Sequence, residues 1–244
     1  MSHARRVFHE EIDSESVVLG PEESHHALKV LRLKTGDTLE GFDGKGGSRP
    51  ARLGEIRRHE AEVVFTEPKA SRERQAPWIT LAVAPPKGQR MDTLVQMAQE
   101  IGLDELVPII TENAVSQEFS GNRYERWRRV AIAAAKQSGA GFLVEMKPAV
   151  GLAELLKGSR HWDMRILCHT GAQLPSLREL MAGSPKPKRV LVAVGPEGGF
   201  SEQEISAAGA AGCAVARLPA PTLRVETAAV FALSALCHEF DRTS

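Results

Sequence analysis

The chain of 244 residues has few cysteines, few aromatic residues and no excess of charge of either sign. Its three cysteines, Cys168, Cys213 and Cys237, are too few and too widely spaced for a disulfide framework or a zinc knuckle, so we expect buried free thiols. The 31 basic and 31 acidic side chains give a formal net charge of zero, whereas nucleic-acid binding normally appears as a basic excess. Any contact with nucleic acid must therefore come from local clusters.

Long apolar runs are also missing. The sequence has no run of about 18 apolar residues, and residues 1–6 lack the apolar core of a signal peptide. Hydrophobic residues make up 42% of the chain and charged residues 25%, as in an ordinary soluble protein. His25-His26 has no partner at the spacing of metal ligands, so we predict no metal site. These absences favour a cytoplasmic protein.

Two regions with different patterns follow one another along the chain. Residues 1–70 carry short apolar pieces between turn residues, with one expected helix at 21–32, which predicts a small β-barrel domain. The polar segment 71–77 has no periodicity and is the expected linker. Residues 78–244 alternate apolar runs with helical patterns, which predicts an α/β domain whose mostly parallel sheet is covered on both faces.

The expected elements can be given as residue ranges. Strands are expected at 17–19, 37–42, 51–56 and 61–65 in the first region, and at 79–84, 106–110, 142–146, 164–168, 190–194 and 213–218 in the second. Helices are expected in the second region at 92–101, 123–138, 152–156, 201–212 and 228–240. The successive strand, loop and helix units place loops at the carboxyl ends of strands.

A glycine-rich loop follows the apolar run Val190–Val194. Five consecutive apolar residues are typical of a strand buried on both faces, and the glycines at 195–199 form a turn whose backbone can approach a ligand closely. Ser201 and Glu204 have the spacing of a capping box, which predicts that a helix begins there. A second loop, 218–227, follows the next strand. Ligands of open parallel sheets bind at such strand ends.

The glycine loop excludes two common nucleotide sites. It has no Lys-Ser or Lys-Thr pair of a Walker loop and lacks the G-x-G-x-x-G of a dinucleotide-binding fold. On glycine content alone, a plain tight turn is the favoured interpretation. The complete string GPEGGFS at 195–201 is more specific than its glycine content.

GPEGGFS, followed by LRVETA at 223–228, resembles the RsmE-type 16S ribosomal RNA uridine-N3 methyltransferases of the SPOUT superfamily. Further matching strings lie at 5–8, 25–37, 87–102 and 134–138. The resemblance implies a PUA-like RNA-binding barrel at 1–70 and a knotted α/β methyltransferase domain at 78–244. It also implies S-adenosylmethionine (SAM) as methyl donor, 16S ribosomal RNA or the small ribosomal subunit as partner, and a homodimer with the active site at the subunit interface.

The two loops supply the expected binding residues for this donor. We expect backbone groups of the loops to hold its adenosine portion, as in other preformed concave sites. The candidates are His169, Gly195, Pro196, Glu197, Gly198, Leu218 and Leu223.

Uridine N3 carries a proton at neutral pH, so a protein that methylates it must accept that proton or stabilise the resulting anion. Arg224 is the candidate for the second task, as a fixed cation beside the uracil carbonyl groups. Glu226 could orient Arg224 or, if burial raised its pKa, accept the proton. The alternative is an ion pair between the two side chains at the start of a helix. The resemblance favours the functional interpretation.

Five basic side chains in family-like strings are candidate phosphate contacts, because neutralising phosphates is what positions a protein on RNA. They are Arg5, Arg6, Arg32, Lys87 and Arg90. For each of them, a solvated position on the surface is the alternative.

The chain departs from the family pattern where arginines are usual, for example at Asn113 and at Gly139-Ala140-Gly141. Arginines bind phosphate and developing negative charge, so these departures bear on the substrate. Two alternatives therefore stay open. The chain could methylate another RNA site, such as a ribose 2′-hydroxyl, or be a catalytically inactive RNA-binding assembly factor.

Overall fold

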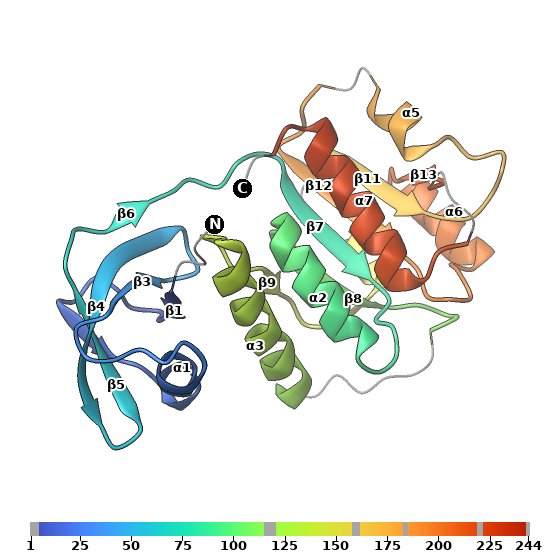
Figure 1. Ribbon diagram of the computed structural model, residues 1–244. Coiled ribbons are helices and arrows are strands. Elements are labelled where there is room, and N and C mark those ends of the chain that lie inside the picture. Colours follow the sequence, from blue (N-terminus) through green and yellow to red (C-terminus); the bar gives the residue numbers. More distant parts are fainter. Residues whose placement is uncertain (1–4, 115–120, 158–161, 183–184, 219–221, 243–244) are drawn as a thin grey trace. The chain divides into compact units, whose positions relative to one another are not determined.

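A computed structural model describes residues 5–114, 121–157, 162–182, 185–218 and 222–242 (Figure 1). It divides into two compact units. Unit 1 comprises Met1–Arg74 and Ile132–Leu143, and unit 2 comprises Gln75–Ala131 and Val144–Ser244. The chain first leaves unit 1 after Arg74, returns to it at Ile132 and leaves it again after Leu143. The sequence pattern did not indicate this return.

Unit 1 contains a six-stranded sheet in the order β1-β3-β4-β5-β2, with β6 beside β4. The strands are β1 (Arg6–Phe8), β2 (Ser16–Val18), β3 (Thr38–Phe42), β4 (Gly47–Arg57), β5 (Glu60–Phe65) and β6 (Ala70–Ser71). In β5, Ala61, Val63 and Phe65 are buried and alternate with more exposed residues, so one face of the sheet covers the core. The four strands expected in this region are present, and β1 and β6 were not predicted.

The helix expected at 21–32 is shorter than predicted. It forms α1 (Pro21–His25) and continues as a π-helix, η1 (His26–Val30). Arg32 then takes a left-handed backbone conformation with a φ of 53°, which cannot continue a right-handed helix.

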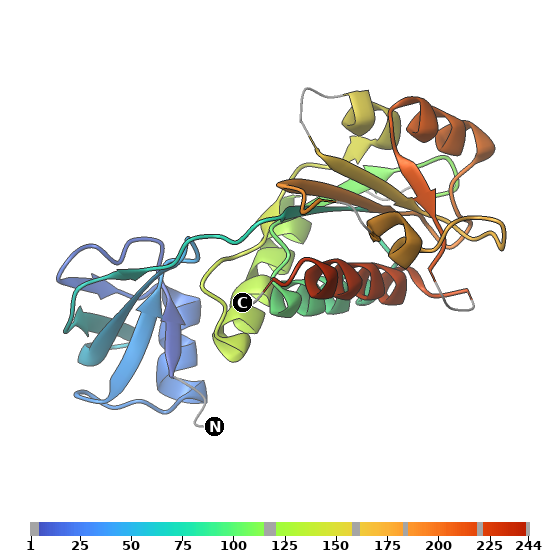
Figure 2. The same cartoon turned by 90° about the horizontal axis from the view of Figure 1, so that it is seen from above.

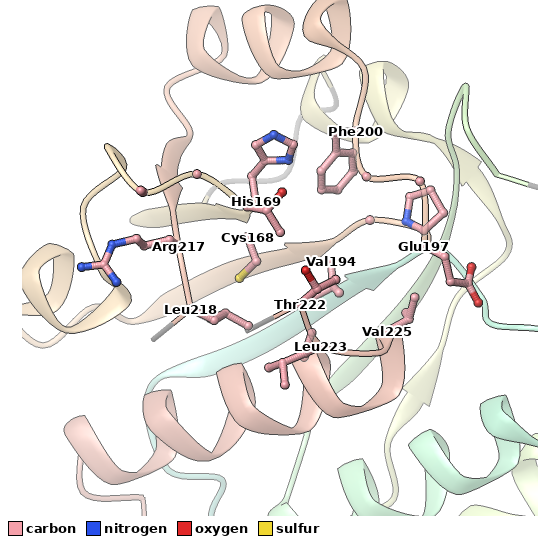
Figure 3. Close-up of a pocket in the computed structure, with 18 residues that line it drawn as sticks. Cys168, His169, Val194, Glu197, Phe200, Arg217, Leu218, Thr222, Leu223 and Val225 are labelled. Carbon is pink, nitrogen blue, oxygen red and sulfur yellow. The ribbon is translucent and has the colours of Figure 1, made fainter. Parts of the chain in front are cut away.

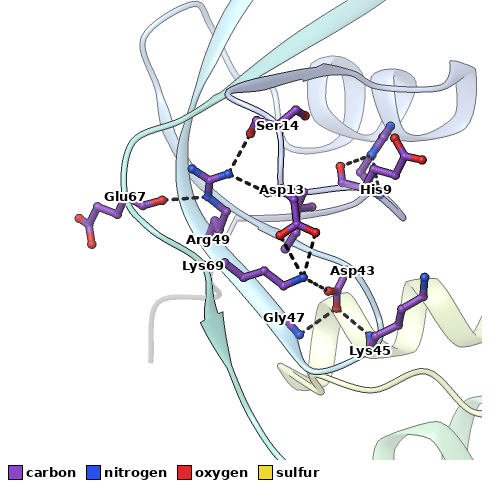
Figure 4. Close-up of polar contacts among 11 residues, drawn as sticks. His9, Asp13, Ser14, Asp43, Lys45, Gly47, Arg49, Glu67 and Lys69 are labelled. Carbon is purple, nitrogen blue, oxygen red and sulfur yellow. Dashed lines mark hydrogen bonds and ion pairs between the residues drawn. The ribbon is translucent and has the colours of Figure 1, made fainter.

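A polar network closes the loop before β4 (Figure 4). The carboxylate of Asp43 accepts the backbone N–H groups of Lys45 at 2.7 Å and Gly47 at 2.8 Å, and Lys69 pairs with both Asp43 and Asp13. Burial alone would raise the pKa of Asp43, but these N–H groups and the Lys69 ammonium together hold that pKa below its ordinary value. The network therefore fixes the loop as part of unit 1.

Unit 2 is built on a parallel sheet in the order β10-β8-β7-β12-β11-β13, with β9 beside β8. Its strands are β7 (Trp78–Val83), β8 (Glu105–Ile110), β9 (Glu145–Met146), β10 (Val150–Gly151), β11 (Met164–Cys168), β12 (Arg189–Val194) and β13 (Ala214–Ala216). Its helices are α2 (Arg90–Ile101), α4 (Leu152–Lys157), α5 (Leu177–Met181), α6 (Glu202–Ala210) and α7 (Val225–Glu239). A further helix, α3 (Gly121–Ser138), begins in unit 2 and ends in unit 1.

The parallel sheet is covered on both faces, as predicted. Helices α2 and α7 lie on one face, and α4 and α6 lie on the other (Figure 2). In β12, Val190, Val192 and Val194 contribute to the core beneath α2 and α7, whereas Leu191 and Ala193 contribute to the opposite core. An uninterrupted apolar strand is required because both of its faces are buried.

The capping box predicted at Ser201 is present. The Ser201 hydroxyl oxygen accepts the backbone N–H of Glu204 at 3.1 Å, and the Glu204 carboxylate accepts the N–H of Ser201 at 2.9 Å. Helix α7 begins at Val225, three residues before the predicted start, with Arg224 as its N-cap. Helix α5 and strand β10 were not predicted.

None of the described helices has the length and apolar character needed to cross a bilayer.

Candidate functional site

A cavity of about 480 Å³ lies at the carboxyl ends of β11, β12 and β13, all within unit 2 (Figure 3). Three loops and the first turn of α7 form its walls. The lining residues are Cys168, His169, Thr170, Gly171, Ala172, Val194, Gly195, Pro196, Glu197, Gly198, Gly199, Phe200, Arg217, Leu218, Thr222, Leu223, Val225 and Ala228. The sequence predicted a ligand site at these strand ends, and parallel strands bring their carboxyl ends to one edge of the sheet.

Each of the seven residues expected to hold the donor lines this cavity: His169, Gly195, Pro196, Glu197, Gly198, Leu218 and Leu223. The structure thus brings together residues from three loops that lie up to 54 positions apart, from His169 to Leu223. Their contact with a donor stays a prediction. Residues 219–221 of the second loop lie outside the described residues.

The glycine loop is a tight turn that a hydrogen bond from another segment of the chain stabilises. The N–H of Gly199 donates to the carbonyl of Pro196 at 2.8 Å, and Gly199 has a φ of +73°, which favours glycine. The side-chain amide of Asn113, from the segment after β8, donates to the carbonyl of Gly199 at 3.2 Å. Asn113 was noted in the sequence only as a departure from the family pattern. Here it supports the wall of the cavity.

Cys168 gives the cavity an apolar, unreactive wall. It ends β11, and its side chain is almost completely buried. Burial raises the pKa of its thiol to about 12, because the thiolate would lose its hydration. The thiol therefore stays protonated at neutral pH and does not compete as a nucleophile.

Arg224 and Glu226 lie beside the cavity and do not line it, whereas Val225 between them does. Arg224 is exposed, and Glu226 is buried, with 11% of its side chain accessible. The ion pair between Arg224 and Glu226 that the alternative interpretation requires is not formed among the described residues. Glu226 instead lies near Arg90, whose Nη1 atom is 4.0 Å from Oε2.

Arg90, the first residue of α2, forms an ion pair with a residue that lines the cavity. Its Nη2 atom is 2.9 Å from Oε1 of Glu197, which belongs to the glycine loop. Its Nε donates to the carbonyl of Lys87 at 3.3 Å. We predicted Arg90 as a phosphate contact, but its guanidinium already has two acidic neighbours.

The other candidate phosphate contacts divide between the units. Arg5 and Arg32 belong to unit 1 and are exposed, and Arg5 lies 3.6 Å from the carboxylate of Asp37. Lys87 belongs to unit 2 and is exposed. These three residues stay candidates.

The structure corrects the prediction that Arg6 contacts phosphate. Its side chain is 4% exposed, and its guanidinium donates to Glu40 at 2.7 Å and to the carbonyl oxygens of Ala135 at 2.8 Å and Ala140 at 3.0 Å. It also lies over the ring of Phe42, 4.2 Å from the centroid. These contacts leave no surface for a phosphate, so Arg6 holds the end of α3 within unit 1 instead.

Among the described residues, no group of three or more His, Cys, Asp or Glu side chains could hold a metal ion.

Comparison with known proteins identifies the family. Residues 73–237 match the family model of an RNA methyltransferase domain, and residues 19–66 match that of an RNA methyltransferase PUA domain. A ribosomal RNA small subunit methyltransferase E from Synechocystis is 31% identical over 236 residues, which cover 96% of this chain and 77% of the relative. The chain belongs to the ribosomal RNA small subunit methyltransferase E family. The resemblance predicted from the GPEGGFS and LRVETA strings is confirmed.

Solved structures of methyltransferases share this fold over the whole chain. The small subunit methyltransferase E from Neisseria gonorrhoeae, bound to S-adenosyl methionine, is 29% identical, with a TM-score of 0.86 over 99% of this chain and 100% of that one. A methyltransferase from Legionella pneumophila in complex with SAM is 28% identical, with a TM-score of 0.87 over 96% and 97% of the two chains. The fold of this chain is thus shared with a small subunit methyltransferase E of known structure.

Proposed function

We propose that the protein is a SAM-dependent methyltransferase that methylates N3 of a uridine in 16S ribosomal RNA. One observation carries the proposal: a single cavity, at the ends of three parallel strands, is lined by every residue that family resemblance assigns to the donor. Membership of the small subunit methyltransferase E family and the SAM-bound Neisseria gonorrhoeae relative support it.

The cavity fits the proposed donor in size and chemistry. Its volume of about 480 Å³ lies within the usual range for small-molecule sites. Val194, Leu218 and Leu223 offer apolar walls for a flat adenine ring, and the backbone of the glycine loop offers polar groups. Glu197 provides a carboxylate at the edge of the cavity for a cationic ligand.

The chain's own residues must handle the proton of the target base. When bound, SAM supplies an electrophilic methyl group, and its sulfur leaves with the electron pair of the broken carbon–sulfur bond. In the proposal, the Glu226 carboxylate accepts the proton of uridine N3, whose electron pair forms the new bond to carbon. Arg224 lies two residues away and places a fixed positive charge beside the uracil carbonyl groups, where negative charge develops.

RNA docking is proposed for the exposed basic residues Arg5, Arg32 and Lys87. Phosphate contacts of this kind position the protein without reading the sequence of the RNA. The edge of a uracil that carries N3 is hidden in a base pair, so the target uridine must be unpaired or turned out of its helix.

Other parts of the proposal rest on the resemblance alone. They are the knotted topology of the methyltransferase domain and the homodimer with a shared active site. The cytoplasmic location is proposed from the sequence pattern. The domain limits, 1–70 and 78–244 with a linker at 71–77, also stay a prediction.

In a second candidate function, SAM is still the methyl donor, but a different RNA atom accepts the methyl group. Asn113, where the family usually has an arginine, favours methylation of another RNA site such as a ribose 2′-hydroxyl. A third, an inactive assembly factor, would have no use for a donor cavity.

The test combines donor binding with product analysis. We expect the wild type to bind SAM at one site per chain in calorimetric titration and to convert uridine to its N3-methyl form in unmethylated small subunits, as mass spectrometry of nucleosides would show. A 2′-O-methyl product would favour the second candidate, and absence of SAM binding the third.

Arg224→Ala distinguishes donor binding from catalysis. We expect it to lower kcat by about 10²-fold or more, because removing a group that stabilises developing charge has an effect of that size. The dissociation constant for SAM should change less than about twofold, because Arg224 does not line the cavity. A large loss of SAM affinity with an unchanged kcat would contradict the assigned role.

A further inference from the structure

One guanidinium group lies between the donor loop and the proposed proton acceptor. Arg90 has Nη2 at 2.9 Å from Oε1 of Glu197 and Nη1 at 4.0 Å from Oε2 of Glu226. Glu197 lines the cavity, and Glu226 adjoins the lining residue Val225. Figure 3 shows Glu197 and Val225 on the same side of the cavity, opposite Arg217.

The Glu226 carboxylate is incompletely satisfied in this structure. Its Oε2 atom is buried and accepts no hydrogen bond from any described residue. A buried acceptor left without a donor is unfavourable, so a nearby donor gains from approaching it. Arg90 Nη1 is such a donor, and an approach of about 1 Å would make a charge-assisted hydrogen bond.

The two helices involved are already held together. Met91, Leu94 and Val95 of α2 share a core with Val225 and Ala229 of α7. The start of α2 is therefore fixed next to the start of α7, and only the arginine side chain needs to move. An arginine in the first turn of a helix opposes the helix dipole, so its two acidic neighbours are needed to stabilise it there.

We propose that Arg90 is a positioning residue of the methyl transfer reaction, which fixes the carboxylate of Glu226 while it anchors the donor loop through Glu197. This rests on the proposed function. Hydrogen bonds that serve catalysis are often long in the ligand-free enzyme and shorten in the reacting complex. Arg90 thereby couples occupancy of the cavity to the orientation of the proton acceptor. The phosphate contact that the sequence suggested for Arg90 predicts a different kinetic result.

The experiment compares Arg90→Gln, Arg90→Lys and Glu197→Gln with wild type, using SAM and unmethylated small subunits. Arg126→Gln is the matched control, because Arg126 pairs with Asp92 near the start of the same helix and does not reach the cavity wall. We expect Arg90→Gln to lower kcat about tenfold or more, with KM for the subunit within about twofold. Arg90→Lys should recover part of kcat, and Arg126→Gln should leave kcat unchanged.

Double variants test separately the interaction of Arg90 with Glu226 and its interaction with Glu197. Arg90→Gln and Glu226→Gln should be non-additive in kcat, because each removes the same interaction. Arg90→Gln and Glu197→Gln should each weaken SAM binding by up to about fivefold and be non-additive in that binding, since exposed ion pairs contribute little. The SAM titrations need no methyl transfer, so the link to Glu197 can be tested even if the proposed function fails.

Two results would overturn the proposal. If Arg90→Gln raised KM for the subunit and left kcat unchanged, Arg90 would be a phosphate contact. If the double variants were additive, Arg90 would act on neither carboxylate. Glu197→Gln changes an exposed side chain, so it keeps the donor link testable even if the Arg90 variants fold poorly.

Discussion

At the scale of single residues, burial decides which reactive groups are available. Cys168 lines the cavity, and burial raises the pKa of its thiol to about 12. Glu226 is buried next to a cation, whereas Arg224 is exposed. The site therefore combines an unreactive thiol, Cys168, with the buried carboxylate of Glu226 and the exposed guanidinium of Arg224.

The raised pKa of Cys168 predicts resistance to alkylation. At pH 8.5 the native protein should leave Cys168 unmodified by iodoacetamide, as mass spectrometry would show, while protein in urea should react fully. A thiol whose pKa is raised in the folded state contributes stability that is complete below about pH 9 and is lost as pH rises towards 12. Rapid native labelling would contradict the burial of this group.

Asn113 should be important for donor binding although it does not line the cavity. Asn113→Ala removes the hydrogen bond to the carbonyl of Gly199, and a bond of this kind contributes about 0.5–1.5 kcal/mol. We expect SAM affinity to fall by about two- to tenfold in calorimetric titration. Asn122→Ala, at an exposed position near the start of α3, is the control and should bind SAM normally. Equal affinities of the two variants would contradict the assignment.

At the scale of elements, the start of α6 sets the end of the glycine loop. The capping box satisfies backbone N–H groups at Ser201 and Glu204 that would otherwise have no partner. Glu204 also accepts the N–H of Glu112 at 3.0 Å, next to Asn113. The helix start and the segment after β8 therefore hold the loop from two sides.

Ser201→Ala should destabilise the fold. The loss of an N-cap side chain typically lowers the free energy of unfolding by about 1 kcal/mol. Urea unfolding would measure it. Ser206→Ala, within the same helix at an exposed position, should be neutral or slightly stabilising, because alanine is the better helix former. A stability loss of equal size in both variants would exclude a specific role for the cap.

At the scale of the whole molecule, the two units contribute different parts of the proposed function. Unit 2 contains the cavity, whereas Arg5 and Arg32, two of the candidate phosphate contacts, belong to unit 1. With a formal net charge of zero, the chain has no general attraction for RNA. Each phosphate contact should therefore be measurable by itself.

The number of phosphate contacts can be measured from how RNA affinity depends on salt concentration. Arg5→Gln and Arg32→Gln should each reduce the slope of log affinity against log salt by about one, with little change in SAM affinity. Arg58→Gln, at another exposed arginine of unit 1, is the control and should leave the slope unchanged. Unchanged slopes for Arg5→Gln and Arg32→Gln would place the RNA elsewhere.

The sequence by itself determined the local elements and the place of the site. The apolar run at 190–194 and the capping box at Ser201 depend on neighbours in the chain, so their physical signals can be read directly. Once the strands are parallel, their carboxyl ends must share one edge, which is why the place of the cavity was predictable, whereas the seven predicted lining residues were assigned with the help of the family resemblance.

Only the tertiary structure decided which distant side chains meet. Arg90 contacts Glu197 and lies near Glu226, and Arg6 reaches the carbonyl of Ala135, yet each had been predicted to contact phosphate. The sequence pattern likewise did not indicate that residues 132–143 return to unit 1. An exposed arginine and a buried, paired one have the same sequence signature, because long-range packing fixes burial and partners.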